Sequence, residues 1–192
     1  LTAFRRDVNV NRHRTFDDLL DYCRYSANPI GRLVLHLFGL FDPVLGKLSD
    51  SICTALQLTN FWQDIAIDLR KGRIYLPQAD LQRFGVVEEH LDAGRVTPGF
   101  IQLMNFQINR TRSLFNKGLP LVSNPIKGSC LPFPQSAYRR LSYEHRLTYL
   151  GGIRILERIE TQGYDVFKHR PTLSVRDKLT IVYRAWGFKT WV

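Results

Sequence analysis

The chain has 192 residues, is 44% hydrophobic and contains 9 prolines, a composition that excludes a disordered chain and predicts one domain with a sizeable core. Its 27 basic and 17 acidic residues give a formal net charge of +10, which indicates an anionic partner such as a diphosphate, an anionic membrane surface or a nucleic acid. The basic residues are scattered and accompany no helix-turn-helix, zinc-finger or RNA-recognition pattern, so we expect no nucleic-acid partner.

The sequence carries no targeting signal that would place it outside the cytoplasm. No window reaches the 18 or more apolar residues of a membrane span, and the first residues, LTAFRRDVNVNRHR, lack a secretory pattern. We therefore expect a cytoplasmic protein, with peripheral contact at the inner face of the membrane left open. The cysteines Cys23, Cys53 and Cys130 are odd in number and widely spaced, which predicts reduced packing thiols.

In chain order, LTAFRRDV reads like the end of a helix already under way. Thr15 is placed to cap the next helix, TFDDLLDYCRYS, whose first turn carries two aspartates. Asn28 and Pro29 predict a break, after which IGRLVLHLFGL continues as an apolar helix. Ala27 and Gly31 line this break with small residues, so a ligand or a neighbouring helix could come close there.

The central element is a predicted helix from Lys47 to Asp68 that follows a turn at residues 41–43. At about 100° per residue, four polar residues fall on one narrow stripe of it, and apolar residues cover most of the rest. The stripe consists of Gln57, Asn60, Asp64 and Asp68. Because buried amides and carboxylates are costly without partners, the stripe predicts a cavity that holds a cation, water or a polar ligand.

Asp64 and Asp68 are one helical turn apart, where like charges repel. Mg²⁺ would offset that repulsion, since it prefers oxygen ligands and is usually held by one or two carboxylates plus substrate phosphates. The alternative is that both aspartates are solvated and paired with Arg70, Lys71 or Arg73. The DxxxD spacing by itself does not decide between the two.

Beyond the stripe, Gly72 and Pro77 end the helix, and the basic loop between them is placed to meet an anion held by the aspartates. Further helices are expected over residues 79–84, 87–93 and 97–119, then a loop over 119–136, then helices over 138–163 and 172–186. The paired glycines 151 and 152 inside one of these helices predict a close approach by a ligand or another helix. With no convincing strand, the predicted fold is all-α.

Two long motifs connect this pattern with a known family. QLTNFWQDIAIDLRKGRIYLP resembles the second aspartate-rich motif of the squalene and phytoene synthases, QxxNxxxDxxxDxxxGRxYLP, and YCRYSANPIGRL resembles a second signature upstream. RFGV and GGIRILERIETQGYDVF extend the similarity over essentially the whole chain. Within the family, the NFWQD spelling and CRYSANPIGRLVLHLFG most resemble the hydroxysqualene synthases of the hopanoid pathway.

The resemblance implies an isoprenoid-synthase bundle around a central cavity, in which Mg²⁺ bridges aspartates and a prenyl diphosphate. It implies metal ligation by Asn60, Asp64 and Asp68, with both aspartates catalytic. Gln57 would complete the polar wall, and Tyr22 would sit at the reacting allyl groups as a third catalytic residue. Judged without the resemblance, Tyr22 is a packed aromatic residue.

The resemblance also implies substrate-binding residues around the diphosphate. Asn60, Gln57 and Arg73 belong to this set, together with Gln63, which stands where many members have arginine. The family commonly has a tyrosine near Gly152 and an arginine near His169, and neither is matched here. Lys168, Arg170 and Lys178 are the basic residues that could replace the arginine, and Lys178 is taken as the candidate.

The family's first aspartate motif should precede Tyr22 by several tens of residues, and no DxxxD occurs there. We therefore expect residues 1–192 to form a single helical domain, the C-terminal two-thirds of a longer chain without its N-terminal helices, and to be inactive alone. The alternative is a shortened relative that lost half of its metal site.

The function implied is Mg²⁺-dependent ionisation of presqualene diphosphate with capture by water to give hydroxysqualene. The alternative within the family is a squalene, phytoene or dehydrosqualene synthase that condenses two prenyl diphosphates such as farnesyl diphosphate, with pathway enzymes as partners. From other classes, a non-catalytic helical partner and a basic membrane-surface or nucleic-acid binder remain.

Overall fold

The computed structural model describes residues 10–123 and 132–188, and these are almost entirely helical, which confirms the all-α prediction. Within these two ranges the extended backbone forms an isolated bridge between Arg12 and Ile74 and no strand. The helices are α2 (Phe16–Ser26), α3 (Asn28–Leu37), α4 (Pro43–Gln63), α5 (Ile65–Arg70), α6 (Gln78–Arg83), α7 (Glu88–Asp92), α8 (Pro98–Ser123), α9 (Gln135–Thr161) and α10 (Val175–Trp186).

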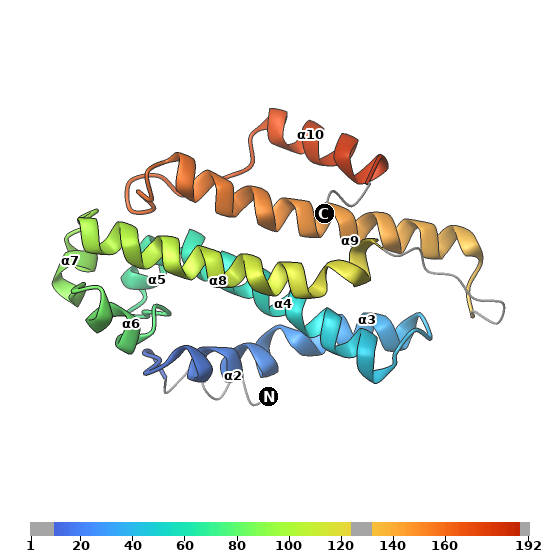
Figure 1. Ribbon diagram of the computed structural model, residues 1–192, viewed down its shortest axis with the longest axis horizontal. Coiled ribbons are helices and arrows are strands. Elements are labelled where there is room, and N and C mark those ends of the chain that lie inside the picture. The colour runs from blue at the N-terminus through green and yellow to red at the C-terminus, as the bar shows by residue number, and fades with distance from the viewer. Residues whose placement is uncertain (1–9, 124–131, 189–192) are drawn as a thin grey trace.

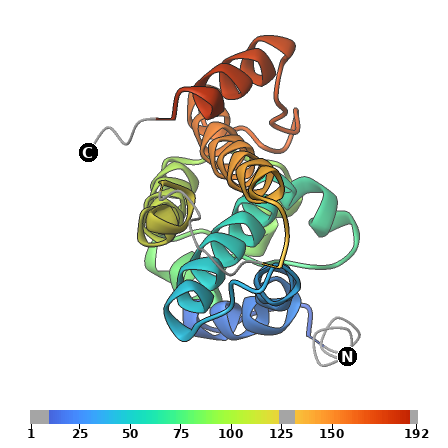
Figure 2. The same cartoon turned by 90° about the vertical axis from the view of Figure 1, so that its right-hand side faces the viewer.

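Three long helices, α4, α8 and α9, run side by side along the long axis of the molecule (Figure 1). Helix α4 is central, because α2 and α3 pack against it on one side and α8 and α9 on the other (Figure 2). Helix α10 lies along the outer side of α9 and leads to the C-terminal end. Within the described residues, no helix is both long and apolar enough to span a membrane.

Helix starts follow local sequence signals. Thr15 caps α2 in a reciprocal capping box with Asp18, as predicted. Asp42 caps α4 by accepting hydrogen bonds from two backbone N–H groups, and Pro43 takes the first helical position, where a missing N–H costs nothing. Ser174 caps α10 in a second capping box, with Asp177.

The core lies between α4, α8 and α9. Trp62 of α4 is fully buried and donates its indole N–H to Thr111 of α8 at 2.9 Å. Gly152 of α9 lets that helix approach closely, since a Cβ there would come within 2.5 Å of the Phe115 ring. Gly151 faces open space, so the predicted close approach applies to Gly152 and is made by a helix.

The structure corrects the prediction of one helix from Lys47 to Asp68. Helix α4 begins four residues earlier, at Pro43, and ends at Gln63, and α5 follows from Ile65. Asp64 is the joint, with φ −105° and ψ 14°. Gln63 and Asp64 bind a distant segment at this joint, as described below.

The other boundaries differ less. Helix α8 continues through Pro120 to Ser123, beyond the predicted end at residue 119, and α9 begins at Gln135. The remainder of the predicted loop, Cys130 and the opening LTAFRRDV lie wholly or mostly outside the described residues. Cys23 and Cys53 are free thiols, and burial raises the pKa of Cys23 to about 12, which suits a packing role.

Candidate active site

The polar stripe lies on an open face of α4 and α5. Asn60 is exposed, while Gln57, Asp64 and Asp68 are half-buried. On one side of the stripe Phe61 contacts Tyr22 of α2, and on the other side Gln63 contacts Pro171. The stripe is therefore bordered by α2 on one side and by the loop between α9 and α10 on the other. That loop is about one hundred residues after the stripe in the chain.

Asp64 is paired with Arg170, which comes from that loop. The Arg170 Nε donates to Oδ1 at 2.5 Å and its Nη2 donates to Oδ2 at 3.2 Å, a bidentate arrangement that raises the pKa of the guanidinium. The predicted partners Arg70, Lys71 and Arg73 do not occupy this carboxylate in the described structure. The site thus places a cationic fork directly on the first aspartate of the motif.

Gln63 lies beside this ion pair and is buried. Its side-chain amide donates to the backbone carbonyl of Pro171 at 2.5 Å. The contact ties the residue after Arg170 to the C-terminal end of α4. A neutral amide at position 63 therefore helps to hold Arg170 over Asp64, whereas an arginine there would bring a buried charge.

Asp68 is in a different electrostatic setting. The pKa of Asp68 is raised, mainly by burial and secondly by the neighbouring negative charge of Asp64. The positive charges of Lys71 and Arg73 lower it by less. No basic side chain of the described residues lies within ion-pair distance of it. Asp68 and Arg73 line a small pocket whose remaining walls are apolar: Phe61, Ile65, Leu69, Ile74, Tyr75, Leu76 and Leu91.

An aromatic cluster adjoins the stripe. The rings of Phe61 and Tyr75 stack with centroids 3.8 Å apart, and Tyr22 lies 6.0 Å from each. His13 adds a fourth ring, 5.5 Å from Tyr22. Tyr22 is 6% exposed and Phe61 is 5% exposed, so both rings are buried within this cluster.

Lys178 is not brought to this site. It is exposed on α10, which packs along the outer side of α9 and away from α4 (Figure 1). Arg170 is the basic residue that the fold delivers to Asp64. Arg170 was among the basic residues near His169 that the sequence offered, and its position next to His169 was the signal that favoured it over Lys178.

The donor atoms suit Mg²⁺. Asn60, Asp64 and Asp68 offer amide and carboxylate oxygens from one stripe, and two carboxylates are a typical protein share of a magnesium site. Burial first and the charge of Asp64 second raise the pKa of Asp68, and a bound cation would favour the ionised carboxylate against both. No group of three or more histidine, cysteine, aspartate or glutamate side chains gathers in the described ranges, so substrate oxygens and water would complete the coordination.

Known proteins show the same pattern over this chain. Residues 1–177 match the family model described as squalene/phytoene synthase. Phytoene synthase 1 of Arabidopsis thaliana is 32% identical over 97% of the chain and 43% of its own length. The hydroxysqualene synthase of Rhodopseudomonas palustris is 37% identical over 64% of the chain and 42% of its own length.

Solved structures agree. The squalene synthase HpnC from Alicyclobacillus acidocaldarius is 43% identical, with a TM-score of 0.75, over 85% of this chain and 57% of that one. A dehydrosqualene synthase in complex with a ligand, 22% identical with a TM-score of 0.76, shares the fold. The chain spans less than half the length of the Arabidopsis thaliana and Rhodopseudomonas palustris relatives. On the family model and the long alignments together, the chain belongs to the squalene/phytoene synthase family.

Proposed function

We propose that this chain supplies the second aspartate motif and part of the diphosphate site of an Mg²⁺-dependent enzyme that converts presqualene diphosphate into hydroxysqualene. The observation that carries the proposal is the meeting of Asp64 with Arg170 on a stripe that also presents Asn60 and Asp68. Oxygen donors for a cation and a guanidinium for an anion then stand at one place, beside aromatic rings.

The chemistry asked of the site is the departure of diphosphate. Bound Mg²⁺ would neutralise the charge that develops on the leaving oxygens. Asn60, Asp64 and Asp68 would hold the ion. Arg170 donates hydrogen bonds in a planar fork that fits phosphate oxygens as well as carboxylate, so it could exchange Asp64 for the substrate.

The carbon skeleton needs the opposite environment. Loss of diphosphate from presqualene diphosphate leaves a cyclopropylcarbinyl cation that rearranges to an allylic cation. Aromatic faces stabilise these cations, and apolar walls protect them from early capture by water. Phe61 and Tyr75 are stacked and line the pocket beside Asp68, and Tyr22 packs against both rings. Tyr22 then acts by supporting these rings.

Similarity supports hydroxysqualene as the product. Two hydroxysqualene synthases, from Rhodopseudomonas palustris and Zymomonas mobilis, are 37% and 39% identical over 64% and 61% of the chain. Phytoene synthases reach 30–32% over 97%. Gln63 stands where many members have arginine, and its amide donates to Pro171, so we assign it to holding Arg170 in place.

The test supplies presqualene diphosphate to the full-length protein in ¹⁸O-labelled water with Mg²⁺ and without a reductant. We expect an ¹⁸O-labelled alcohol by mass spectrometry, with no product when Mg²⁺ is chelated. Squalene that forms only with NADPH, or an unlabelled hydrocarbon that forms without it, would instead assign the chain to the squalene or the phytoene and dehydrosqualene branch. Absence of any turnover would favour the non-catalytic helical partner.

A further inference from the structure

Helix α10 has an apolar face that the described structure leaves uncovered. The side chains on it are Val175, Leu179, Val182, Tyr183 and Trp186, exposed by 74%, 66%, 49%, 82% and 85%. At about 100° per residue they share one arc of roughly 100°, the width of an apolar stripe on an amphipathic helix. So much exposed apolar and aromatic surface on one helix indicates an interaction site.

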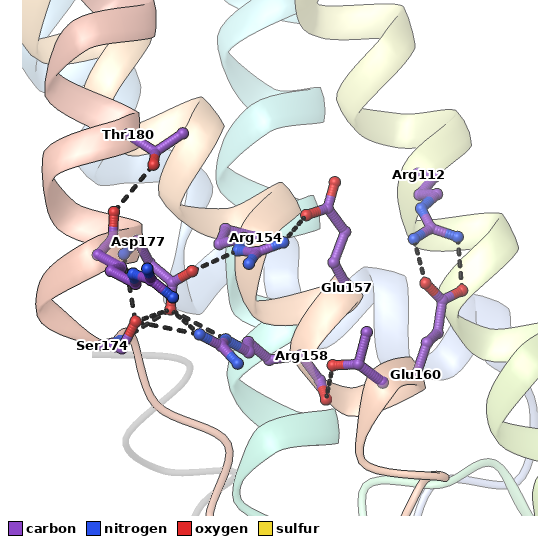
Figure 3. Close-up of polar contacts among 10 residues, drawn as sticks. Arg112, Arg154, Glu157, Arg158, Glu160, Ser174, Asp177 and Thr180 are labelled. Carbon is purple, nitrogen blue, oxygen red and sulfur yellow. Dashed lines mark hydrogen bonds and ion pairs between the residues drawn. The ribbon is translucent and has the colours of Figure 1, made fainter.

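The opposite face of α10 is fixed to the protein. Asp177 is 3% exposed and binds Arg154 at 2.7 Å and Arg158 at 2.9 Å, both on α9, as well as Ser174 (Figure 3). Ile181 and Ala185 are buried on the same side. The apolar face is therefore held outward, and rotation of α10 to hide it would break this ion-pair network.

Charge on α10 indicates what covers the outward face. Arg176 and Lys178 are exposed and flank the apolar arc. By helical rotation Arg176 lies about 20° beyond Tyr183 at one edge, and Lys178 lies about 40° beyond Val182 at the other. The acidic residue of the helix, Asp177, faces inward and is neutralised by two arginines. A helix with aromatic and aliphatic residues on one face and basic residues along its margins is the pattern of a helix that lies in a membrane interface.

We infer that α10 docks the protein on an anionic lipid surface, with Trp186 and Tyr183 at headgroup depth and Arg176 and Lys178 against lipid phosphates. Trp and Tyr prefer this depth because an apolar ring and a polar tip are both satisfied there. The overall charge of +10 acts in the same direction. The inference stands apart from the proposed reaction, since it rests on the surface of α10 alone.

The test is flotation of the purified full-length protein with vesicles of phosphatidylcholine, with and without phosphatidylglycerol. We expect binding to the anionic vesicles that weakens in high salt. The double variant Tyr183→Ser/Trp186→Ser should lower the partition coefficient by about tenfold or more, because two large apolar side chains no longer enter the interface. Quenching of tryptophan fluorescence by brominated lipids should fall in Trp186→Phe.

Two matched controls locate the effect. Leu33→Ser/Leu37→Ser removes two exposed apolar residues from α3, and both side chains are 64–65% exposed. Lys47→Gln/Lys117→Gln removes two exposed charges from α4 and α8, for comparison with Arg176→Gln/Lys178→Gln on α10. The α10 variants should lose vesicle binding, while the partition coefficient of Leu33→Ser/Leu37→Ser should stay within about twofold of wild type. Lys47→Gln/Lys117→Gln should lower it only by the effect of two fewer positive charges, and by less than Arg176→Gln/Lys178→Gln does. Circular dichroism verifies folding, and the charge variant tests the surface if the apolar variant unfolds.

Three outcomes would overturn the inference. One is equal binding by the α10 variants and wild type. Another is a wild-type dimer in analytical ultracentrifugation that Tyr183→Ser/Trp186→Ser makes monomeric, with no vesicle binding by either, which would assign the face to a second copy. The third is a monomer that does not bind vesicles at all.

Discussion

At the scale of single residues, Asp64 carries the strongest functional expectation. Asp64→Asn keeps the shape and one acceptor oxygen for Arg170 but removes the negative charge that Mg²⁺ requires. We expect most of the activity of the full-length protein to be lost. Melting should hardly change, because half-exposed ion pairs contribute about 0–1 kcal/mol.

Turnover and thermal melting by circular dichroism measure the two effects. Asp92→Asn, an exposed carboxylate at the end of α7, is the matched control and should leave both unchanged. An active Asp64→Asn protein with ordinary magnesium dependence would remove Asp64 from the metal site.

Asp68 should show a conflict between activity and stability. Its pKa is raised in the folded state, so the folded protein is most stable relative to the unfolded chain when Asp68 is protonated, and it loses that stability as pH rises through the raised pKa. Asp68→Asn should therefore melt higher than wild type at pH 7 without Mg²⁺ while being less active. The two should converge below about pH 4, near the ordinary pKa of aspartate.

The measurement is melting temperature against pH, with and without Mg²⁺. Magnesium should narrow the difference in melting temperature between wild type and Asp68→Asn, because it should stabilise wild type alone. A wild-type protein that melts as high as Asp68→Asn at pH 7 without Mg²⁺ would show that the ionised Asp68 carboxylate does not destabilise the fold.

At the scale of elements, the loop between α9 and α10 is held to α4 by Gln63. Gln63→Leu removes the donor to the Pro171 carbonyl, and an unsatisfied buried group costs about 1–3 kcal/mol. We expect that loss in denaturant unfolding. We also expect lower activity that Mg²⁺ does not restore, since Arg170 would no longer be positioned over Asp64.

Gln82→Leu is the control, because Gln82 is an exposed glutamine on α6 that makes no contact with Pro171. It replaces the same side chain without removing a buried hydrogen bond. Full activity in Gln63→Leu, together with the expected loss of stability, would limit Gln63 to a structural role.

The attachment of α10 to α9 also belongs to this scale. The pKa of Asp177 is held well below its usual range by side-chain hydrogen bonds. The largest effect comes from Ser174, followed by Arg158 and Arg154. A lowered pKa means that the stabilisation is present at neutral pH and is lost only as pH falls below the ordinary value of about 3.9. Amide exchange in α10 should thus be insensitive to pH between 7 and 5, after correction for intrinsic rates, and fast in Asp177→Asn.

Glu144→Gln serves as the control, because its partner Arg140 is exposed on the same helix. Slow exchange of α10 in Asp177→Asn would mean that Ile181 and Ala185 suffice to dock it.

At the scale of the whole molecule, the site depends on the close contact of α4, α8 and α9. Gly152→Ala would place a methyl group 2.5 Å from the Phe115 ring and 3.0 Å from Leu56, and overpacking of this kind costs about 1–3 kcal/mol. Gly151→Ala is the neighbouring control with nothing within 4 Å, and it should stabilise by about 0.5–1 kcal/mol through helix propensity. Chemical denaturation of both variants checks the opposite signs, and equal effects would contradict the packing described.

The sequence by itself determined the helical class, the cap at Thr15 and the polar stripe, because these depend on residues within a few turns of one another. It also determined the family, through two long motifs. The tertiary structure alone decided that Asp64 is a joint between two helices and that Arg170, not Lys178, reaches it. It alone decided that Tyr22 packs against Phe61 and Tyr75 and that α10 turns its apolar face outward. Helical periodicity specifies which face a residue occupies, whereas contacts over some hundred residues depend on how the helices pack, and that is set by the shapes of distant side chains.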